Sequence, residues 1–178
     1  MRPYVIDFPA SGRLGVMSRP EGGSGLAAHL QKLRGRGVDT LVCALTPGER
    51  NLLGLDTEPE EARQAGLSFV EFPIADFSVP DAAALKRLAR QIAKDVRKGH
   101  FVVVHCRGGI GRSGVVAGAA LIALGSGADE AMRLVSEARG VPAPETEEQR
   151  NLLRSLEKRP ARRSPKGATG PKRPTTGT

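Results

Sequence analysis

Residues 105–113 (HCRGGIGRS) place a cysteine, three glycines and two arginines within a short stretch. The glycines at 108, 109 and 111 allow backbone conformations in which successive N–H groups point toward one anion. Arg112, six residues after Cys106, can hold two phosphate oxygens with its planar guanidinium. The sequence therefore predicts a loop that cradles a tetrahedral phosphate, formed by Arg107, Gly108, Gly109, Ile110, Gly111 and Arg112.

Cys106 lies at the floor of this predicted loop. The backbone N–H donors, the N-terminal end of the following helix and the nearby arginine all favour its thiolate, which is the nucleophilic form of cysteine. The same donors can follow the negative charge that spreads over the phosphoryl oxygens during transfer. One loop would thus supply both the nucleophile and the charge stabilisation for attack on a phosphate monoester.

A leaving oxygen also needs a proton, and Asp76 is the candidate donor. It lies 30 residues before Cys106, in a segment bounded by Pro73 and Pro80, and proton donors are commonly carried on such loops. Asp81 is the alternative, but its place after Pro80, just ahead of a helix-forming stretch, is typical of a helix cap. In a second step the ionised Asp76 would accept a proton from the attacking water.

The elements that must position these residues alternate between strand-like and helix-like patterns. This alternation predicts an α/β fold with a central, mostly parallel sheet flanked by helices. The run at 101–105 (FVVVH) is typical of a central strand covered on both faces, and it leads through the loop into a helix expected from about 113 to 124. Further strands are predicted at 4–8, 12–18, 38–45 and 67–72, short helices and turns at 46–65, and helices at 26–35, 81–99, 128–139 and 146–157.

Charge is uneven along the 178 residues. The chain has 27 Lys and Arg against 19 Asp and Glu, a net charge of +8, but residues 158–178 hold seven basic residues and no acidic one. Residues 1–157 are therefore nearly neutral and are predicted to form one domain, while 158–178, rich in Pro, Gly and basic residues, are predicted to be a disordered basic tail. A solvated tail is favoured over a nucleic-acid contact.

Several classes of protein are not expected. The chain has two cysteines, Cys43 and Cys106, too few for a disulfide framework, and no recognisable secretory signal, so the cytoplasm is the expected compartment. The longest uncharged apolar run, residues 114–124, is much shorter than the roughly twenty residues of a membrane span. Neither His29 nor His100 has metal-type partners nearby in the sequence, and no metal or cofactor is expected.

At residues 105–113 the chain resembles the cysteine-dependent protein phosphatases, the protein-tyrosine and dual-specificity superfamily, whose mark is His-Cys-x5-Arg-Ser/Thr. Together with residues 73–81 (PIADFSVPD), this loop is similar to that of the kinase-associated dual-specificity phosphatases. The resemblance covers about residues 38–157. It implies hydrolysis of phosphate monoesters through a phosphocysteine intermediate, with phosphorylated proteins as substrates, phosphotyrosine first and phosphoserine and phosphothreonine open.

The resemblance also implies roles for residues around the loop. Asp76 matches the family's acid, Ser113 would donate a hydrogen bond that eases departure of the Cys106 thiolate, and His105 would order the loop. Gln149 lies in a segment similar to one that positions the hydrolytic water, although Thr146 and Gln149 also form a capping-box pattern. Ser113 has an alternative role too, as the cap of the next helix.

Alternatives to phosphatase activity remain at this level. A sulfurtransferase-like domain also carries a thiolate in an anion-binding loop, but it has less need of Asp76 and Ser113. A module that binds phosphoproteins without hydrolysing them could have lost Cys106, Arg112 or Asp76, and all three are present. Cys43 is either a small core residue or a partner for a reversible disulfide with Cys106. Phe77, next to the acid, is the nearest candidate for an aromatic contact with the substrate.

Overall fold

The computed structural model describes residues 2–157, and its sheet is built around one strand that is buried along its whole length. This strand, β5 (Phe101–Cys106), is rich in valine, whose β-branched side chains suit a strand packed on both faces. β2 (Arg13–Ser18) and β3 (Thr40–Cys43) pair with it in parallel, one on each side. β4 (Ser68–Glu71) is parallel to β3 and β1 (Tyr4–Val5) is antiparallel to β2, so the strand order is β1-β2-β5-β3-β4.

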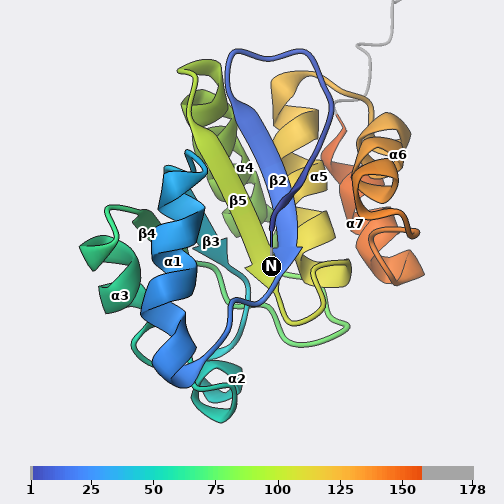
Figure 1. Ribbon diagram of the computed structural model, residues 1–178. Helices are drawn as coiled ribbons and strands as arrows, with labels where there is room; N and C mark the ends of the chain where they lie inside the picture. Colours follow the sequence, from blue (N-terminus) through green and yellow to red (C-terminus); the bar gives the residue numbers. More distant parts are fainter. Residues whose placement is uncertain (1, 158–178) are drawn as a thin grey trace, which may run out of the picture.

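Helices cover both faces of this sheet (Figure 1). Helices α4 to α7 lie on one face, α1 and α3 lie on the other, and α2 and the short 3-10 turn η1 lie in connections at the end of the sheet where β5 stops. Their bounds are η1 (Gly23–Gly25), α1 (Leu26–Gly35), α2 (Pro47–Leu52), α3 (Glu58–Gln64), α4 (Ala82–Arg97), α5 (Gly111–Leu124), α6 (Ala128–Arg139) and α7 (Glu147–Leu156).

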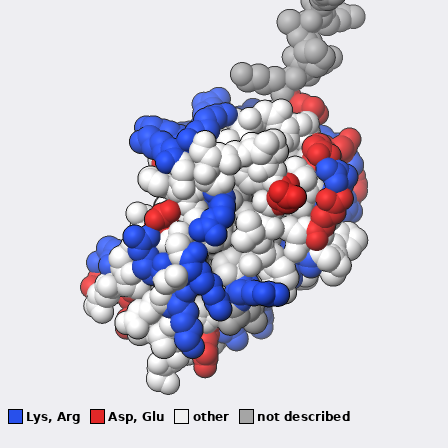
Figure 2. Space-filling view, turned by 45° about the horizontal axis from the view of Figure 1, so that its top comes forward, with Lys and Arg blue, Asp and Glu red and all other residues white. Residues whose placement is uncertain are grey.

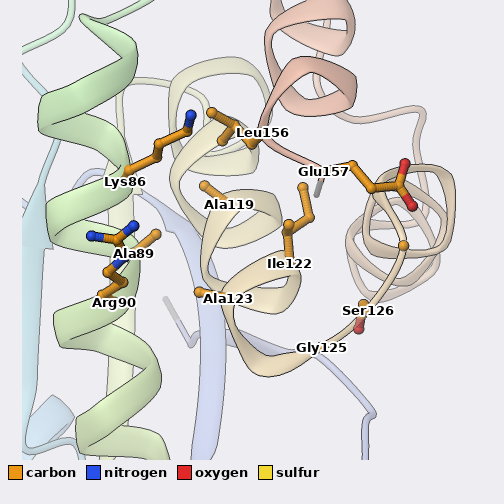
Figure 3. A pocket seen from close by; sticks show the side chains of 11 residues that line it. Lys86, Ala89, Arg90, Ala119, Ile122, Ala123, Gly125, Ser126, Leu156 and Glu157 are labelled. Atoms are coloured by element: carbon orange, nitrogen blue, oxygen red, sulfur yellow. The ribbon is translucent and has the colours of Figure 1, made fainter. Parts of the chain in front are cut away.

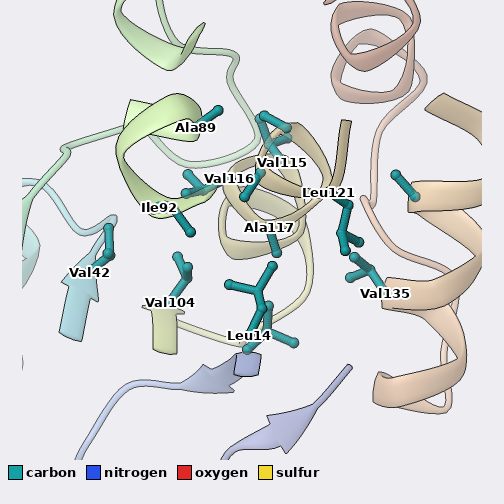
Figure 4. Packing of buried hydrophobic residues seen from close by; sticks show 14 of the residues in the cluster. Leu14, Val42, Ala89, Ile92, Val104, Val115, Val116, Ala117, Leu121 and Val135 are labelled. Atoms are coloured by element: carbon teal, nitrogen blue, oxygen red, sulfur yellow. The ribbon is translucent and has the colours of Figure 1, made fainter. Parts of the chain in front are cut away.

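Successive residues of β5 enter opposite hydrophobic clusters, because neighbouring side chains of a strand point to opposite faces. Val102 and Val104 pack with the residues of α4 and α5, whereas Phe101 and Val103 pack with those of α1. Figure 4 shows the larger cluster, in which Leu14 and Val104 of the sheet face Val116 and other residues of α5. Burying one such side chain contributes roughly 1.5–3 kcal/mol, so the packing fixes the position of β5 and of the loop that follows it.

Helix α5 is the element that carries the loop into the core. Its residues are buried without interruption from Gly111 to Leu121. Gly118 allows α7 to approach closely, since a Cβ at this position would lie 2.7 Å from Cδ1 of Leu153. The first turn of α5 is therefore held by the strand before it and by the helices packed against it.

The α/β architecture predicted from the sequence is confirmed. All five strands lie where they were predicted, but β1 spans 4–5 instead of 4–8, β3 spans 40–43 instead of 38–45 and β4 spans 68–71 instead of 67–72. The α6 bounds and the cap at Asp81, whose carboxylate accepts from the Ala84 N–H at 2.7 Å, agree with the expectations. The start of α5 differs too, because the helix begins at Gly111 rather than near Ser113. The predicted basic tail, residues 158–178, lies outside the described residues.

Acidic and basic side chains gather on different parts of the surface. Figure 2 shows a face on which acidic side chains gather at the right, over α6, and basic ones toward the left. On α6, Arg133 forms ion pairs with Glu130 and Glu137. Between residues 2 and 157, no helix has both the length and the apolar character that a membrane crossing requires.

Candidate active site

The loop between β5 and α5 curls around the sulfur of Cys106. The N–H of Gly109 donates to Cys106 Sγ at 3.2 Å, and the Ser113 hydroxyl lies 3.4 Å from the same sulfur. Cys106 is buried, with 2% of the residue exposed. Two polar groups thus already face the sulfur and can stabilise a negative charge on it.

Gly109 shows why this loop needs glycine. Its φ of +76° lies in the left-handed region, which residues with a Cβ rarely adopt. A Cβ there would also lie 2.4 Å from the backbone carbon of Met17, at the end of β2. The close approach of β2 and the left-handed conformation therefore act together to turn the Gly109 N–H toward the sulfur.

Arg112 is buried in the first turn of α5, with 2% of its side chain exposed. Its Nη1 donates to a carboxylate oxygen of Glu49 at 2.7 Å and to the carbonyl oxygen of Ile74 at 3.0 Å. Its Nη2 lies 3.0 Å from Oδ1 of Asp76. The guanidinium is thus fixed from one side by Glu49 and the Ile74 carbonyl, while Asp76 holds its other edge.

Glu49 was not predicted from the sequence as part of this site. It is the third residue of α2, where it forms a capping box with Thr46. Although burial raises the pKa of Glu49, hydrogen bonds from Arg112 and Thr46 lower it to about 2. The Thr-x-x-Glu pattern could have revealed the cap, but nothing in the sequence connects α2 with Arg112, 63 residues away.

Ser113 has a different local setting from the one expected of a helix cap. The cap position of α5 is Ile110, which offers no side-chain hydrogen bond, and Ser113 lies inside the first turn. The capping alternative for Ser113 is therefore wrong. Its hydroxyl contacts the Cys106 sulfur instead.

Asp76 lies in the connection between β4 and α4, and its carboxylate is within ion-pair distance of Arg112. Its side chain is 45% exposed, and its carboxylate accepts from the backbone N–H of Phe77 at 3.2 Å. Phe77 is 62% exposed and has a φ of +56°, unusual for a residue with a large side chain. The structure therefore brings Asp76 to the loop and leaves the Phe77 ring at the surface beside it.

Gln149 is fully buried, and both ends of its carboxamide are engaged. Its Oε1 accepts from the backbone N–H of Thr146 at 3.3 Å, which completes the capping box of α7. Its Nε2 donates to the carbonyl oxygen of Ser78 at 3.1 Å. Gln149 thus ties α7 to the segment that carries Asp76.

His105 points away from the loop, toward α3. Its Nε2 lies 2.9 Å from Oε1 of Glu58, and both side chains are fully buried. Burial lowers the pKa of His105, but the charge of Glu58 raises it to about 10. The ligand-type atoms of Cys43, Glu58 and His105 lie within 4.8 Å of one another.

Cys43 is a direct neighbour of His105 in the sheet, not of Cys106. The register pairs Cys43 with His105, and the Cys43 side chain packs in the cluster with α1. Cys106 belongs to the cluster with α4 and α5. The two sulfurs therefore lie on opposite faces of the sheet, and the disulfide alternative for Cys43 is wrong for this fold.

Of two cavities in the structure, one lies away from this loop and the other adjoins it. The larger, about 520 Å³, lies between α4, the end of α5 and the end of α7, where Lys86, Ile122 and Glu157 line it (Figure 3). None of the residues 105–113 lines it. The second cavity, about 450 Å³, includes Arg107 in its wall and therefore adjoins the loop.

The arrangement combines a sulfur nucleophile, donors to that sulfur, a fixed guanidinium and a carboxyl group within one small region. Such a set can bind a tetrahedral oxyanion, attack it and exchange a proton with its leaving group. Among known proteins, the family model described as polymorphic toxin system, DSP-PTPase phosphatase matches residues 15–126. The chain belongs to this DSP-PTPase family. Its match includes Asp76 and the whole of residues 105–113.

The individual relatives and solved structures compared with this DSP-PTPase have low sequence identities, between 22% and 30%. Human cyclin-dependent kinase inhibitor 3 is 26% identical over 125 residues, which are 69% of this chain and 59% of the relative. The chain thus spans about three fifths of that relative's length. The crystal structure of kinase associated phosphatase (KAP) with its catalytic cysteine changed to serine has a TM-score of 0.81 at 22% identity, covering 88% of this chain and 93% of the other. Tk-PTP in its active form has a TM-score of 0.70 at 30% identity, covering 88% and 98%.

Proposed function

We propose that this DSP-PTPase hydrolyses phosphate monoesters on proteins through a phosphocysteine intermediate. The observation that carries the proposal is the sulfur of Cys106, which accepts from the Gly109 N–H at 3.2 Å beside the buried guanidinium of Arg112. Membership in a phosphatase family supports the reaction class.

In the first step the Cys106 thiolate attacks phosphorus, forming the S–P bond as the bond from phosphorus to the leaving oxygen breaks. The Arg112 guanidinium and the loop N–H groups of residues 107–112 hold the phosphoryl oxygens. Asp76, protonated, gives its proton to the leaving oxygen. Because Asp76 lies 3.0 Å from Arg112 Nη2, a bound phosphate competes with its carboxylate for that edge and frees it to face the leaving group.

In the second step a water molecule attacks the phosphocysteine. The ionised Asp76 accepts a proton from this water, the S–P bond breaks, and inorganic phosphate leaves. The Ser113 hydroxyl, 3.4 Å from the sulfur, donates to the departing thiolate and stabilises its charge. Glu49 acts through Arg112, whose Nη1 it holds at 2.7 Å.

Phosphorylated protein is the substrate class that we propose, with phosphotyrosine first and phosphoserine and phosphothreonine as further options. The exposed ring of Phe77 lies beside Asp76 and can contact an aromatic leaving group.

The experiment measures phosphate release from an aryl phosphate, a phosphotyrosine peptide, a phosphothreonine peptide and an inositol lipid. Wild type should release phosphate from the aryl phosphate and at least one peptide, and Cys106→Ser should release none while still binding. Cys43→Ser is the matched control, because it changes the other cysteine on the opposite face of the sheet. Peptide binding without phosphate release by wild type, or transfer of sulfur from thiosulfate to cyanide without phosphate release, would overturn the proposal.

A further inference from the structure

The peptide that links Gly108 to Gly109 is held at both of its polar ends. Its N–H, that of Gly109, donates to Cys106 Sγ at 3.2 Å. Its carbonyl oxygen, that of Gly108, accepts from Nη2 of Arg139 at 3.3 Å. In a trans peptide, as this one is, the carbonyl oxygen and the N–H point in opposite directions. The contact with Arg139 therefore turns the N–H toward the sulfur.

This peptide needs such a contact because the chain on either side of it is glycine. Without a Cβ, neither Gly108 nor Gly109 strongly restricts rotation of the peptide plane between them. At Gly108 even a Cβ would find no other atom within 4 Å. Turning the plane over would bring the carbonyl oxygen toward the sulfur, where it would repel both a thiolate and a bound oxyanion. The orientation of this one peptide thus affects how well the loop binds an anion.

Arg139, the last residue of α6, is itself held by an aromatic ring. Its Cζ lies over the ring of Tyr4, 4.0 Å from the ring centroid, where a cation is attracted to the negative face of the ring. Throughout residues 2–157, no carboxylate forms an ion pair with Arg139, and its buried Nε has no hydrogen-bond partner. The Tyr4 ring and the Gly108 carbonyl therefore hold this guanidinium in place.

Tyr4 lies near the loop because of the sheet register. It begins β1 and pairs with Val16 of β2, and two residues further along β2 Ser18 pairs with Cys106. Tyr4 is 40% exposed and belongs to neither hydrophobic cluster of the described residues. The contact of its ring with Arg139 thus has a role other than packing the core.

We propose that Tyr4 and Arg139 are positioning residues for the phosphatase reaction. Tyr4 holds the guanidinium of Arg139, and Arg139 holds the peptide between Gly108 and Gly109 with its N–H toward Cys106. This role rests on the proposed function for its effect on turnover. Binding of an oxyanion to the loop tests it without turnover.

The experiment measures the Kd of tungstate, a tetrahedral oxyanion, by calorimetry with the full chain. Arg139→Met keeps the apolar stem but removes the charged donor, and it should raise the Kd about tenfold. Tyr4→Leu should raise the Kd about threefold, and Tyr4→Phe, which keeps a ring, should restore the wild-type value. Arg133→Met is the matched control, because Arg133 lies on the same helix and pairs with Glu130 and Glu137 instead.

A double-variant cycle tests whether Tyr4 acts through Arg139. In the Arg139→Met background, Tyr4→Leu should raise the tungstate Kd no further, since the cation that the ring holds is already gone. Losses of kcat/KM on an aryl phosphate should follow the same order. Thermal unfolding of each variant fixes a temperature at which all of them are fully folded, so that the Kd values report on the loop rather than on folding.

An unchanged Kd in folded Arg139→Met would overturn the positioning role and leave the proposed function standing. Equal weakening in Arg133→Met would also overturn it, because a general charge effect would then explain the result. Independent, additive effects of Tyr4→Leu and Arg139→Met would overturn the part assigned to Tyr4. Weaker tungstate binding by Arg139→Met, together with no phosphate release by wild type from any monoester, would support the positioning of the loop and overturn the proposed function alone.

Discussion

Glu49 accepts a hydrogen bond from Nη1 of Arg112 at 2.7 Å and thereby joins α2 to the first turn of α5. The guanidinium is almost fully buried and Glu49 is largely so, with 2% and 18% of their side chains exposed. The Glu49 carboxylate therefore holds Nη1 of Arg112 and orients Nη2 toward Asp76. Arg112 is fixed before any substrate arrives.

Replacing Glu49 with glutamine tests this orientation. Glutamine keeps the capping-box interaction of α2, so Glu49→Gln removes the charge while preserving the helix start. We expect kcat/KM for an aryl phosphate to fall by up to about tenfold, since a hydrogen bond to a charged group contributes roughly 1.5–3 kcal/mol and a neutral one roughly 0.5–1.5 kcal/mol. Steady-state kinetics measure this change, and an unchanged kcat/KM would show that the Ile74 carbonyl orients Arg112 without Glu49.

The same pair makes stability depend on pH. Because the pKa of Glu49 is lowered from 4.5 to about 2, its stabilising contribution is fully present above about pH 4.5 and is lost as the pH falls through 2. The difference in unfolding free energy between wild type and Glu49→Gln should therefore be constant from pH 7 to pH 5, at roughly 3 kcal/mol or less, and shrink below that. Urea unfolding at each pH measures it. A difference that grew on acidification would contradict the assignment.

Gly109→Ala should destabilise the protein by roughly 2–4 kcal/mol, because it combines a left-handed φ with a Cβ that would lie 2.4 Å from the Met17 backbone. Gly108→Ala is the matched comparison, since a Cβ there has no neighbour within 4 Å and its φ is not in the left-handed region. Thermal unfolding of both variants measures the difference. Equal midpoints would show that β2 and the loop adjust to the added methyl group.

Asp76→Asn should reduce kcat about a hundredfold or more on an alkyl phosphate, and much less on an aryl phosphate with a good leaving group, because general acid catalysis matters most for poor leaving groups. Asp81→Asn is the control, since asparagine caps a helix as well as aspartate does and Asp81 accepts from the Ala84 N–H. Rates on the two substrates measure the contrast. Equal losses on both substrates in Asp76→Asn would show that Asp76 acts in some way other than as the proton donor.

Gln149→Met should lower activity without making phosphocysteine accumulate. Both ends of the Gln149 carboxamide are engaged, one with Thr146 and one with Ser78, so its expected role is to hold the segment of Asp76 rather than to orient water. Rapid-quench kinetics on an aryl phosphate measure the burst of leaving group. A burst in Gln149→Met that is absent in the cap variant Thr146→Val would assign Gln149 to the hydrolytic water.

The fold was largely predictable because its signals are local. A buried valine-rich run indicated β5, and Asp81 and Thr146 each marked the start of a helix. The start of α5 was placed two residues late because the loop itself enters the helix. Ile110 occupies the cap position without a side-chain hydrogen bond, so no capping signal marks the boundary.

The site was predictable where the residues are neighbours in sequence and less so where the fold brings distant segments together. Cys106, Gly109 and Arg112 lie in one loop, and their spacing carries the chemistry. The contacts of Arg112 with Glu49 and of His105 with Glu58 depend on where α2 and α3 lie against the end of the sheet, which no short pattern reveals. The opposite faces of Cys43 and Cys106 likewise depend on strand register.

The most direct test of the account is mass spectrometry of the enzyme quenched in acid during turnover of an aryl phosphate. We predict a mass increase of one phosphoryl group on the peptide that contains Cys106. This increase should be missing in Cys106→Ser. A phosphoryl group on any other residue, or continued phosphate release by Cys106→Ser, would contradict the assignment of this sulfur as the nucleophile.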